Sequence, residues 1–293
     1  MKILLTGGEG MLAKDFLSVL DQFPELECHV PPGKELDIRN QEQVVSIIKN
    51  YRPDILLNCA AYTKVDKAET ESALAFHVNG ISVGKLAEVC HRSGVKIVHL
   101  STDFVFDGNN CSPVTESNHT APLGVYGKSK RDGEARIEAS DADWLTVRTS
   151  WLFAAHGHNF VRTMLRLGRE RDEIRVVSDQ VGSPTWTRDL ALALCKLIKG
   201  DVKNYVHFGG LNSCSWFELA NYTLKQAHQI GLIQTLPLVT PIQTHQYPLP
   251  APRPAYSVLS TQRYQELTGS QPMMWEEAVN SVLKRLHEKS QDE

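Results

Sequence analysis

The sequence predicts an α/β protein in which a doubly wound parallel sheet is followed by a smaller, less regular α/β region. Over residues 1–150, short apolar segments alternate with amphipathic helical segments, which is typical of a parallel sheet with helices on both faces. The strands are nearly continuous in apolar residues, as in Ile97-Val98-His99-Leu100, which indicates that both faces are covered. A glycine-rich turn after the first strand is the third observation.

Short sequence patterns predict each strand and helix of residues 1–150. Apolar runs predict strands at Lys2–Thr6, Leu26–Val30, Ile55–Leu57, Lys96–Leu100 and Leu145–Thr149. Apolar residues at helical spacing predict helices at Met11–Leu20, from Asn40 to Tyr51, in two pieces over Ala68–Cys90, and at Gly127–Ala139. Pro31 stops the second strand, and Asn40 can cap the helix that follows.

Beyond residue 150 the alternation is less regular. Helices are expected at Asn159–Arg171, Trp186–Lys199 and Trp275–Leu286. Residues 234–258 carry most of the late prolines, which predicts a loop. We therefore expect one domain at residues 1–150 and a smaller one at residues 151–293, with the chain crossing between them and a ligand in their cleft.

Composition excludes several classes of protein. Hydrophobic residues make up 42% and charged residues 22%, and the net charge is −3, which argues against nucleic acid or a membrane surface as the main partner. The first apolar run breaks at Thr6-Gly7-Gly8, unlike a signal peptide. The six cysteines lack metal-ligand or redox-motif spacing, so we expect reduced thiols and a cytoplasmic protein.

The glycine-rich turn predicts a dinucleotide site. Gly7 permits a tight turn after the strand, and Gly10 lets a diphosphate approach the backbone. The helix then starts at Met11 and Leu12, where free N–H groups and the helix dipole favour an anion. The turn therefore predicts a Rossmann-type NAD(P)-binding domain at residues 1–150, which leaves residues 151–293 as the mainly substrate-binding part.

The second strand favours NADPH over NADH. It ends in Val30-Pro31-Pro32, without the acidic residue that would bind the 2′-hydroxyl of NAD. Lys34 follows shortly, and a cation there can hold the 2′-phosphate of NADP. The alternative is that Lys34 is a solvated loop lysine, which leaves NADH open.

A hydroxyl, a phenol and an ammonium form a candidate catalytic set. Thr102 ends an apolar strand, and Tyr126 and Lys130 are four residues apart, so they share one face of a helix. We expect Lys130 to lower the pKa of Tyr126. Tyr126 would then protonate a ketone oxygen held by Thr102 as hydride reaches the carbon. The Tyr–Lys spacing alone is weak evidence for a catalytic pair. The glycine-rich turn upstream strengthens that interpretation.

Several further motifs together resemble the dTDP-4-dehydrorhamnose reductases of the extended short-chain dehydrogenase/reductase superfamily. They are Gly7–Ala13, Glu35–Ile38, Asn58–Thr63, Val65–Glu69, Ser101–Asp103, Tyr126–Lys130, Arg148–Trp151, Asn159-Phe160, Asp179–Thr185 and Arg253-Pro254. The resemblance implies NAD(P)H-dependent reduction of the 4-keto group of a nucleotide-activated 6-deoxyhexose, as in the step from dTDP-4-dehydro-L-rhamnose to dTDP-L-rhamnose. It also implies Thr102, Tyr126 and Lys130 as the catalytic set.

The resemblance assigns further residues to cofactor and sugar nucleotide. It implies cofactor contacts at Asp37, Ile38, Ala60, Ala61 and Tyr62, and sugar-nucleotide contacts at Thr102, Asp103, Phe104, Trp151, Asn159 and Arg253. Trp151 is equally suited to a core, and Asn159 to a helix cap. A lone cation such as Arg253 suits a diphosphate, with a structural salt bridge as the alternative. Asp103 either orients Thr102 or touches the sugar.

One departure from the family bears on the rival functions. Phe104 stands where the family usually has tyrosine, which leaves the identity of the sugar open. A dehydratase would need a glutamate there, and an epimerase a serine-rich segment in place of Thr102-Asp103. The rival of another class is a non-catalytic subunit like the regulatory subunit of methionine adenosyltransferase, which the intact Thr102, Tyr126 and Lys130 disfavour.

The sequence indicates no metal site, because acidic residues are dispersed and histidines and cysteines do not cluster. Some relatives bind Mg²⁺ at a subunit contact, and relatives are often dimers. The resemblance therefore allows Mg²⁺ and a homodimer, although no stretch of sequence marks an interface.

Overall fold

The computed structural model describes residues 1–33 and 35–291. Its centre is a parallel sheet with strands in the order β10-β5-β4-β3-β1-β2. These strands are β1 (Lys2–Thr6), β2 (Glu27–His29), β3 (Ile55–Asn58), β4 (Lys96–Thr102), β5 (Trp144–Thr149) and β10 (Asn204–Phe208). The winding reverses between β1 and β3, the place where such sheets bind ligands. The predicted doubly wound α/β fold is confirmed.

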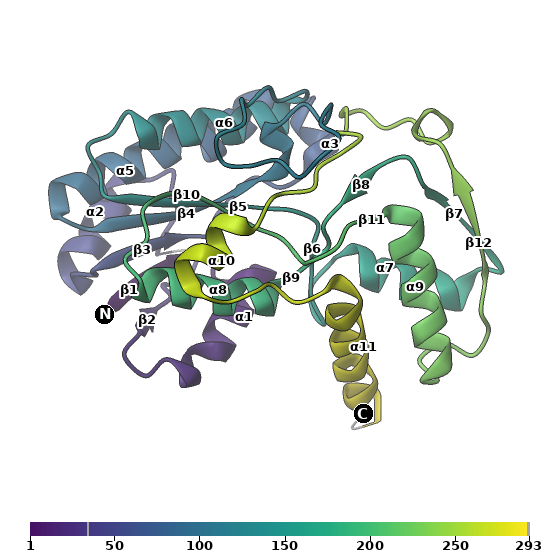
Figure 1. Ribbon diagram of the computed structural model, residues 1–293. Coiled ribbons are helices and arrows are strands. Elements are labelled where there is room, and N and C mark those ends of the chain that lie inside the picture. The colour runs from purple at the N-terminus through teal and green to yellow at the C-terminus, as the bar shows by residue number, and fades with distance from the viewer. Residues whose placement is uncertain (34, 292–293) are drawn as a thin grey trace.

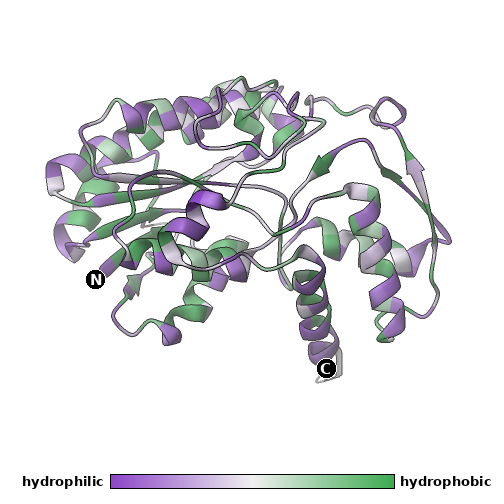
Figure 2. Cartoon of the chain, viewed as in Figure 1, coloured by the Kyte–Doolittle hydropathy of each residue, from purple (hydrophilic) through white to green (hydrophobic). Residues whose placement is uncertain are grey.

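Helices cover both faces of this sheet (Figure 1). α1 (Met11–Val19) and α8 (Thr187–Lys199) pack on one face, in a cluster that contains Phe16 and Leu190. α2 (Gln41–Tyr51), α5 (Ser82–Ser93) and α6 (Val125–Glu138) lie on the other face, where Ile48 and Leu86 join a second cluster. Figure 2 shows the consequence, because the sheet strands are largely hydrophobic and the outer sides of the helices are hydrophilic.

Short sequence patterns predicted most of these helices. Asn40 caps α2 by accepting from the amides of Glu42 and Gln43, as predicted. α6 begins at Val125, two residues before the predicted start. The helix predicted in two pieces over Ala68–Cys90 is α3 (Val65–Ala68), α4 (Ser72–Phe76), a π-helical turn (His77–Ile81) and α5. The π turn packs closely on α6, because a Cβ at Gly133 would lie 2.1 Å from the Asn79 carbonyl oxygen.

The second region has its own core. α7 (Phe160–Glu170), α9 (Trp216–Gln229) and α11 (Trp275–Gln291) surround a cluster with the parallel pair β7 (Glu173–Val177) and β12 (Leu238–Ile242). Two short ladders join β6 (Leu152–Phe153) to β9 (Thr185–Trp186), and β8 (Val181–Gly182) to β11 (Cys214–Ser215). β12 corrects the predicted loop at 234–258. Pro241 is tolerated there because β12 pairs on one side only, with β7.

The chain crosses back into the first region after residue 150. β10, which the sequence did not predict, forms the outer edge of the central sheet beside β5. α10 (Gln262–Thr268) brings Tyr264 onto Phe208 of β10, with ring centroids 4.8 Å apart. The division at residue 150 stays a prediction. Among residues 1–33 and 35–291, no helix is long and apolar enough to cross a membrane.

Candidate active site

The turn after β1 has the shape of a diphosphate cradle. Gly7 has φ +71°, and a Cβ on it would lie 2.7 Å from the amide nitrogen of Ala60, so only glycine fits. The Gly10 amide donates to the Gly7 carbonyl at 3.0 Å and precedes α1. No side chain of the described residues caps the first turn of α1, which leaves the helix start at Met11 and Leu12 suited to an anion.

The segment after β2 brings Arg39 to the edge of a small cavity. Lys34 lies outside the described residues. Asp37 forms an ion pair with Arg39, whose hydrogen bonds lower the pKa of that carboxyl. Ile38 is buried in the cluster under α2, so only its backbone is free to meet a ligand. Arg39, which the sequence did not single out, lines a cavity of about 310 Å³.

The loop after β3 forms the other side of this small cavity. Ala61 and Tyr62 line it together with Arg39, and Ala60 packs against Gly7. The Tyr62 amide donates to the side chain of Asn79 at 2.8 Å, and its phenol donates to Glu71 at 2.6 Å. The structure therefore brings most of the predicted cofactor residues to the carboxyl ends of β1 and β3.

Thr102 and Asp103 form a single unit at the end of β4. The Thr102 hydroxyl donates to the Asp103 carboxylate at 2.9 Å and accepts from the Phe104 amide at 3.2 Å. Asp103 thus orients Thr102, one of the two roles left open by the sequence. Burial raises the pKa of Asp103 to about 6. The Phe104 ring meets Tyr126 edge-on, with centroids 5.6 Å apart.

The expected effect of Lys130 on Tyr126 is wrong. The Lys130 ammonium donates to the Leu100 carbonyl at 2.6 Å and lies 3.2 Å from His99 Nε2, so it is held against β4. Burial raises the pKa of Tyr126 to about 12, although a hydrogen bond with Thr102 acts in the opposite direction. Burial also lowers the pKa of Lys130, to about 8. Tyr126 is therefore a phenol over the whole neutral range.

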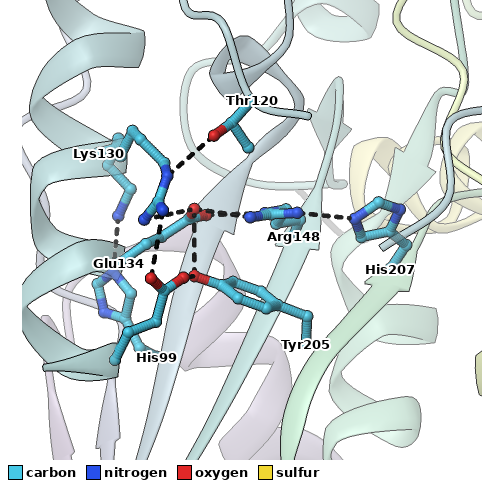
Figure 3. A network of polar contacts seen from close by, with 9 residues as sticks. His99, Thr120, Lys130, Glu134, Arg148, Tyr205 and His207 are labelled. Atoms are coloured by element: carbon cyan, nitrogen blue, oxygen red, sulfur yellow. Dashed lines mark hydrogen bonds and ion pairs between the residues drawn. The ribbon is translucent and has the colours of Figure 1, made fainter. Parts of the chain in front are cut away.

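A buried polar network anchors α6, the helix that carries Tyr126 and Lys130 (Figure 3). Glu134 accepts two hydrogen bonds from Arg148 of β5, at 2.8 and 2.9 Å. The Arg148 guanidinium stacks over the Tyr205 ring, 4.0 Å from its centroid, and lies 3.4 Å from His207. Because Glu134 is one turn beyond Lys130, this network fixes the position of Lys130 relative to the sheet.

Trp151 and Asn159 have structural roles. Trp151 stacks on Trp216, with ring centroids 3.4 Å apart, and covers Gly182, where a Cβ would lie 2.4 Å from the indole. Asn159 caps α7 and donates to the Ala154 carbonyl at 2.9 Å. Trp151 thus packs in a core and Asn159 caps a helix, which are the two alternative roles that the sequence left open. Contact of either residue with a sugar nucleotide stays a prediction.

Arg253 lies in a larger cavity. That cavity has a volume of about 810 Å³ and is lined by Trp216, Tyr247 and Arg253 among others. Arg253 forms a bidentate ion pair with Asp66, at 2.8 and 3.0 Å, so the salt bridge that was the alternative is present. Its neighbour Pro252 would lie 3.2 Å from a Cβ on Gly124, which places the cavity beside the start of α6.

The same part of the chain offers no metal centre. Among the described residues, no three or more histidine, cysteine, aspartate or glutamate side chains are grouped so that they could hold an ion. Every cysteine is a free thiol in the structure. The site is therefore built from a glycine cradle, a hydroxyl, a phenol and an ammonium.

Fold and site together define an oxidoreductase of the extended short-chain dehydrogenase/reductase superfamily. Residues 1–288 match the family model described as RmlD substrate binding domain. The chain is 39% identical to the dTDP-4-dehydrorhamnose reductase of Aggregatibacter actinomycetemcomitans, covering 96% of this chain and 98% of the relative. It is 40% identical to the enzyme of the same name from Burkholderia thailandensis, covering 98% and 99%.

A solved structure agrees with these relatives. The dTDP-4-dehydrorhamnose reductase of Bacillus anthracis, in complex with NADP, superposes with a TM-score of 0.91 at 37% identity and covers 97% of this chain and 99% of its own. The chain therefore belongs to the dTDP-4-dehydrorhamnose reductase family. The resemblance inferred from the sequence motifs is confirmed.

Proposed function

We propose that this protein reduces dTDP-4-dehydro-L-rhamnose to dTDP-L-rhamnose, with NADPH preferred over NADH and Tyr126 as the proton donor. The observation that carries the proposal is the meeting of Thr102, Tyr126 and Lys130 at the carboxyl end of β4. Relatives that cover nearly the whole chain are named for this reaction, which supports the choice of substrate.

The cofactor fits the cradle that the chain provides. Gly7 and Gly10 leave space for a diphosphate beside the backbone, and the start of α1 at Met11 and Leu12 would hold it. Arg39, which lines the small cavity together with Lys64, is a described cation that suits a 2′-phosphate, in the role expected of Lys34. When bound, the nicotinamide supplies the hydride. The chain itself has to hold and protonate the carbonyl oxygen.

The proton comes from Tyr126. Its phenol is protonated at neutral pH, because burial holds its pKa at about 12, so a proton is available throughout the working range. Thr102 donates its single hydroxyl proton to Asp103 in the free site and would turn that proton to the same oxygen when the ketone is bound. Lys130, held on Leu100, adds a positive charge at this end of the sheet, which would favour the negative charge that develops on the carbonyl oxygen.

The cavity beside α6 is the proposed nucleotide site. Its aromatic side chains, among them Trp216 and Tyr247, suit a base, and Arg253 suits a diphosphate. Phe104 lies against Tyr126 and has no hydroxyl for the sugar, so the sugar must be recognised by other groups. A non-catalytic subunit is disfavoured, because the catalytic set is complete and assembled.

Other features stay predictions. These are the two domains at residues 1–150 and 151–293, a cytoplasmic location, a homodimer and Mg²⁺ at a subunit contact.

The test is turnover of NADPH with dTDP-4-dehydro-L-rhamnose, in the wild type and in Tyr126→Phe. We expect the variant to lose about 10²- to 10⁴-fold in kcat while it binds NADPH as well as the wild type, because only the proton donor is removed. Full activity of Tyr126→Phe would remove its role as donor. Absence of turnover by the wild type with any 4-keto sugar nucleotide would remove the proposed function.

A further inference from the structure

A chain of four buried polar side chains crosses the carboxyl ends of β1, β3 and β4 and ends at Lys130. Thr6, Asn58, His99 and Lys130 are each at most 2% exposed. The Thr6 hydroxyl lies 2.6 Å from Asn58 Oδ1, Asn58 Nδ2 lies 2.9 Å from His99 Nδ1, and His99 Nε2 lies 3.2 Å from Lys130 Nζ. Because these side chains are almost wholly buried, each needs a hydrogen-bond partner inside the protein.

A charged Lys130 allows one arrangement of the hydrogen bonds along this chain, and a neutral Lys130 makes the reverse arrangement available. A neutral imidazole carries one proton and accepts at the other nitrogen, and burial together with Lys130 keeps the pKa of His99 well below its usual range. An ammonium only donates. A charged Lys130 therefore requires an unprotonated Nε2 and a proton on Nδ1 of His99.

With Lys130 charged, Asn58 must present its oxygen to His99 Nδ1–H and its NH₂ group to Thr6. A neutral Lys130 has a lone pair that can accept, so the hydrogen bonds can run the other way. Thr6 then donates to Asn58 Oδ1, Asn58 Nδ2 donates to His99 Nδ1, and His99 Nε2–H donates to Lys130. A half-turn of the Asn58 amide interchanges its donor and acceptor in place, so both arrangements use the same atomic positions.

We infer that Asn58 and His99 are positioning residues for Lys130, and that the direction of hydrogen bonding from Thr6 to Lys130 reverses when Lys130 gains or loses its proton. The Leu100 carbonyl accepts from Lys130 in both arrangements. The inference rests on the proposed role of Lys130 in the reduction. It assigns His99 a role that acts through Lys130 and involves no direct contact with the cofactor or the sugar.

The other titratable groups that face Lys130 are Glu134, one turn along α6, and Cys59, just after β3. Glu134 is already paired with Arg148, and burial raises the pKa of the Cys59 thiol to about 12. The Cys59 thiol therefore keeps its proton between pH 7 and 10. A change in the hydrogen bonds of His99 over that range is therefore attributable to Lys130.

The direct test is nitrogen and carbon NMR of the ¹³C,¹⁵N-labelled full chain between pH 7 and 10. Lys130 is followed in parallel through its side-chain carbon signals. We expect His99 to carry its proton on Nδ1 at low pH and on Nε2 at high pH, with the same midpoint as Lys130. A single tautomer throughout, or a Lys130 that does not titrate in this range, would overturn the inference. The exposed His91 is the internal reference.

Asn58→Asp adds a kinetic test with an isosteric side chain. An ionised carboxylate only accepts, so it holds His99 in the Nδ1–H form that a charged Lys130 requires. We expect the alkaline limb of kcat/KM to move up by about one pH unit, while His91→Gln leaves it in place. An unchanged limb in Asn58→Asp would show that Asn58 only supports the fold and would overturn the inference.

The two proposals fail separately. If Lys130→Met abolishes turnover but the His99 tautomer of the wild type never changes, the proposed function stands and the positioning inference falls. If the wild type reduces no sugar nucleotide, the proposed function falls, and the NMR titration still decides whether the hydrogen bonds reverse.

Discussion

Glu134 and Arg148 form a bidentate ion pair at the buried junction between α6 and β5. Their side chains are 0% and 3% exposed, so neither charge has water as an alternative partner. The pair holds α6, the helix of the proposed catalytic residues Tyr126 and Lys130, against β5, the strand beside β4. Breaking a buried pair is costly because the remaining charge is left unpaired.

Arg148→Met should lower the free energy of unfolding by about 3–5 kcal/mol, because it removes the bidentate partner of the buried Glu134 carboxylate and leaves only the longer contacts with Arg131 and Tyr205. Urea denaturation measures this change. The control is Arg136→Met, which breaks the exposed pair of Arg136 and Asp132 on the same helix and should cost at most about 1 kcal/mol. Equal effects of the two variants would contradict the role of the buried pair.

The pH dependence of reduction should follow Lys130 and not Tyr126. Burial lowers the pKa of Lys130 to about 8, so its positive charge is present below that pH and is lost above it. Burial holds the pKa of Tyr126 at about 12, so the phenol keeps its proton in that range. We expect kcat/KM to fall as pH rises through about 8. A profile that stays flat to pH 10 with chemistry rate-limiting would refute this assignment.

Gly7→Ala should weaken NADPH binding at least tenfold, because a Cβ would lie 2.7 Å from the Ala60 amide nitrogen and displace the cradle. Fluorescence titration with NADPH measures the change. Gly94→Ala is the matched control, since Gly94 also has a positive φ, +65°, but no atom within 4 Å of the added Cβ. Both variants should lose about 1–2 kcal/mol of stability from backbone strain. Only Gly7→Ala should lose affinity.

Arg253→Met should raise the KM for the sugar nucleotide at least tenfold with little change in the affinity for NADPH. The reason is that the guanidinium lines the proposed nucleotide cavity. Asp66→Asn removes only its ion-pair partner and is the control. Because the pair is partly exposed, each variant should lose at most about 1 kcal/mol of stability. A matching rise in KM for Asp66→Asn would make the role of Arg253 structural.

Asp103→Asn should stabilise the protein at neutral pH. Burial raises the pKa of Asp103 from 3.8 to about 6, so between these values the native state binds the proton more firmly than the unfolded chain. The native carboxylate therefore costs stability as pH rises, up to about 3 kcal/mol above pH 6. Urea denaturation of both proteins at pH 4 and pH 7 should show the gain at pH 7 only. A gain independent of pH would refute the assignment to this carboxyl.

Local geometry explains why so much of the fold could be predicted from the sequence. The alternation of apolar strands and helices up to Thr149 needs no information about distant residues, because each segment must bury its own apolar face. β10 and β12 escaped prediction for the opposite reason. Their positions depend on pairing with β5 and β7, and Pro241 carries a local signal for a loop.

The candidate site divides in the same way. A glycine at position 7 and helical spacing between Tyr126 and Lys130 are properties of short segments, and the sequence by itself determined both. Which partner the Lys130 ammonium takes was decided only by the tertiary structure, because the Leu100 carbonyl and the His99 imidazole come from a strand some thirty residues away. The burial that sets the pKa values of Tyr126 and Asp103 likewise arises from packing between elements, which no local pattern encodes.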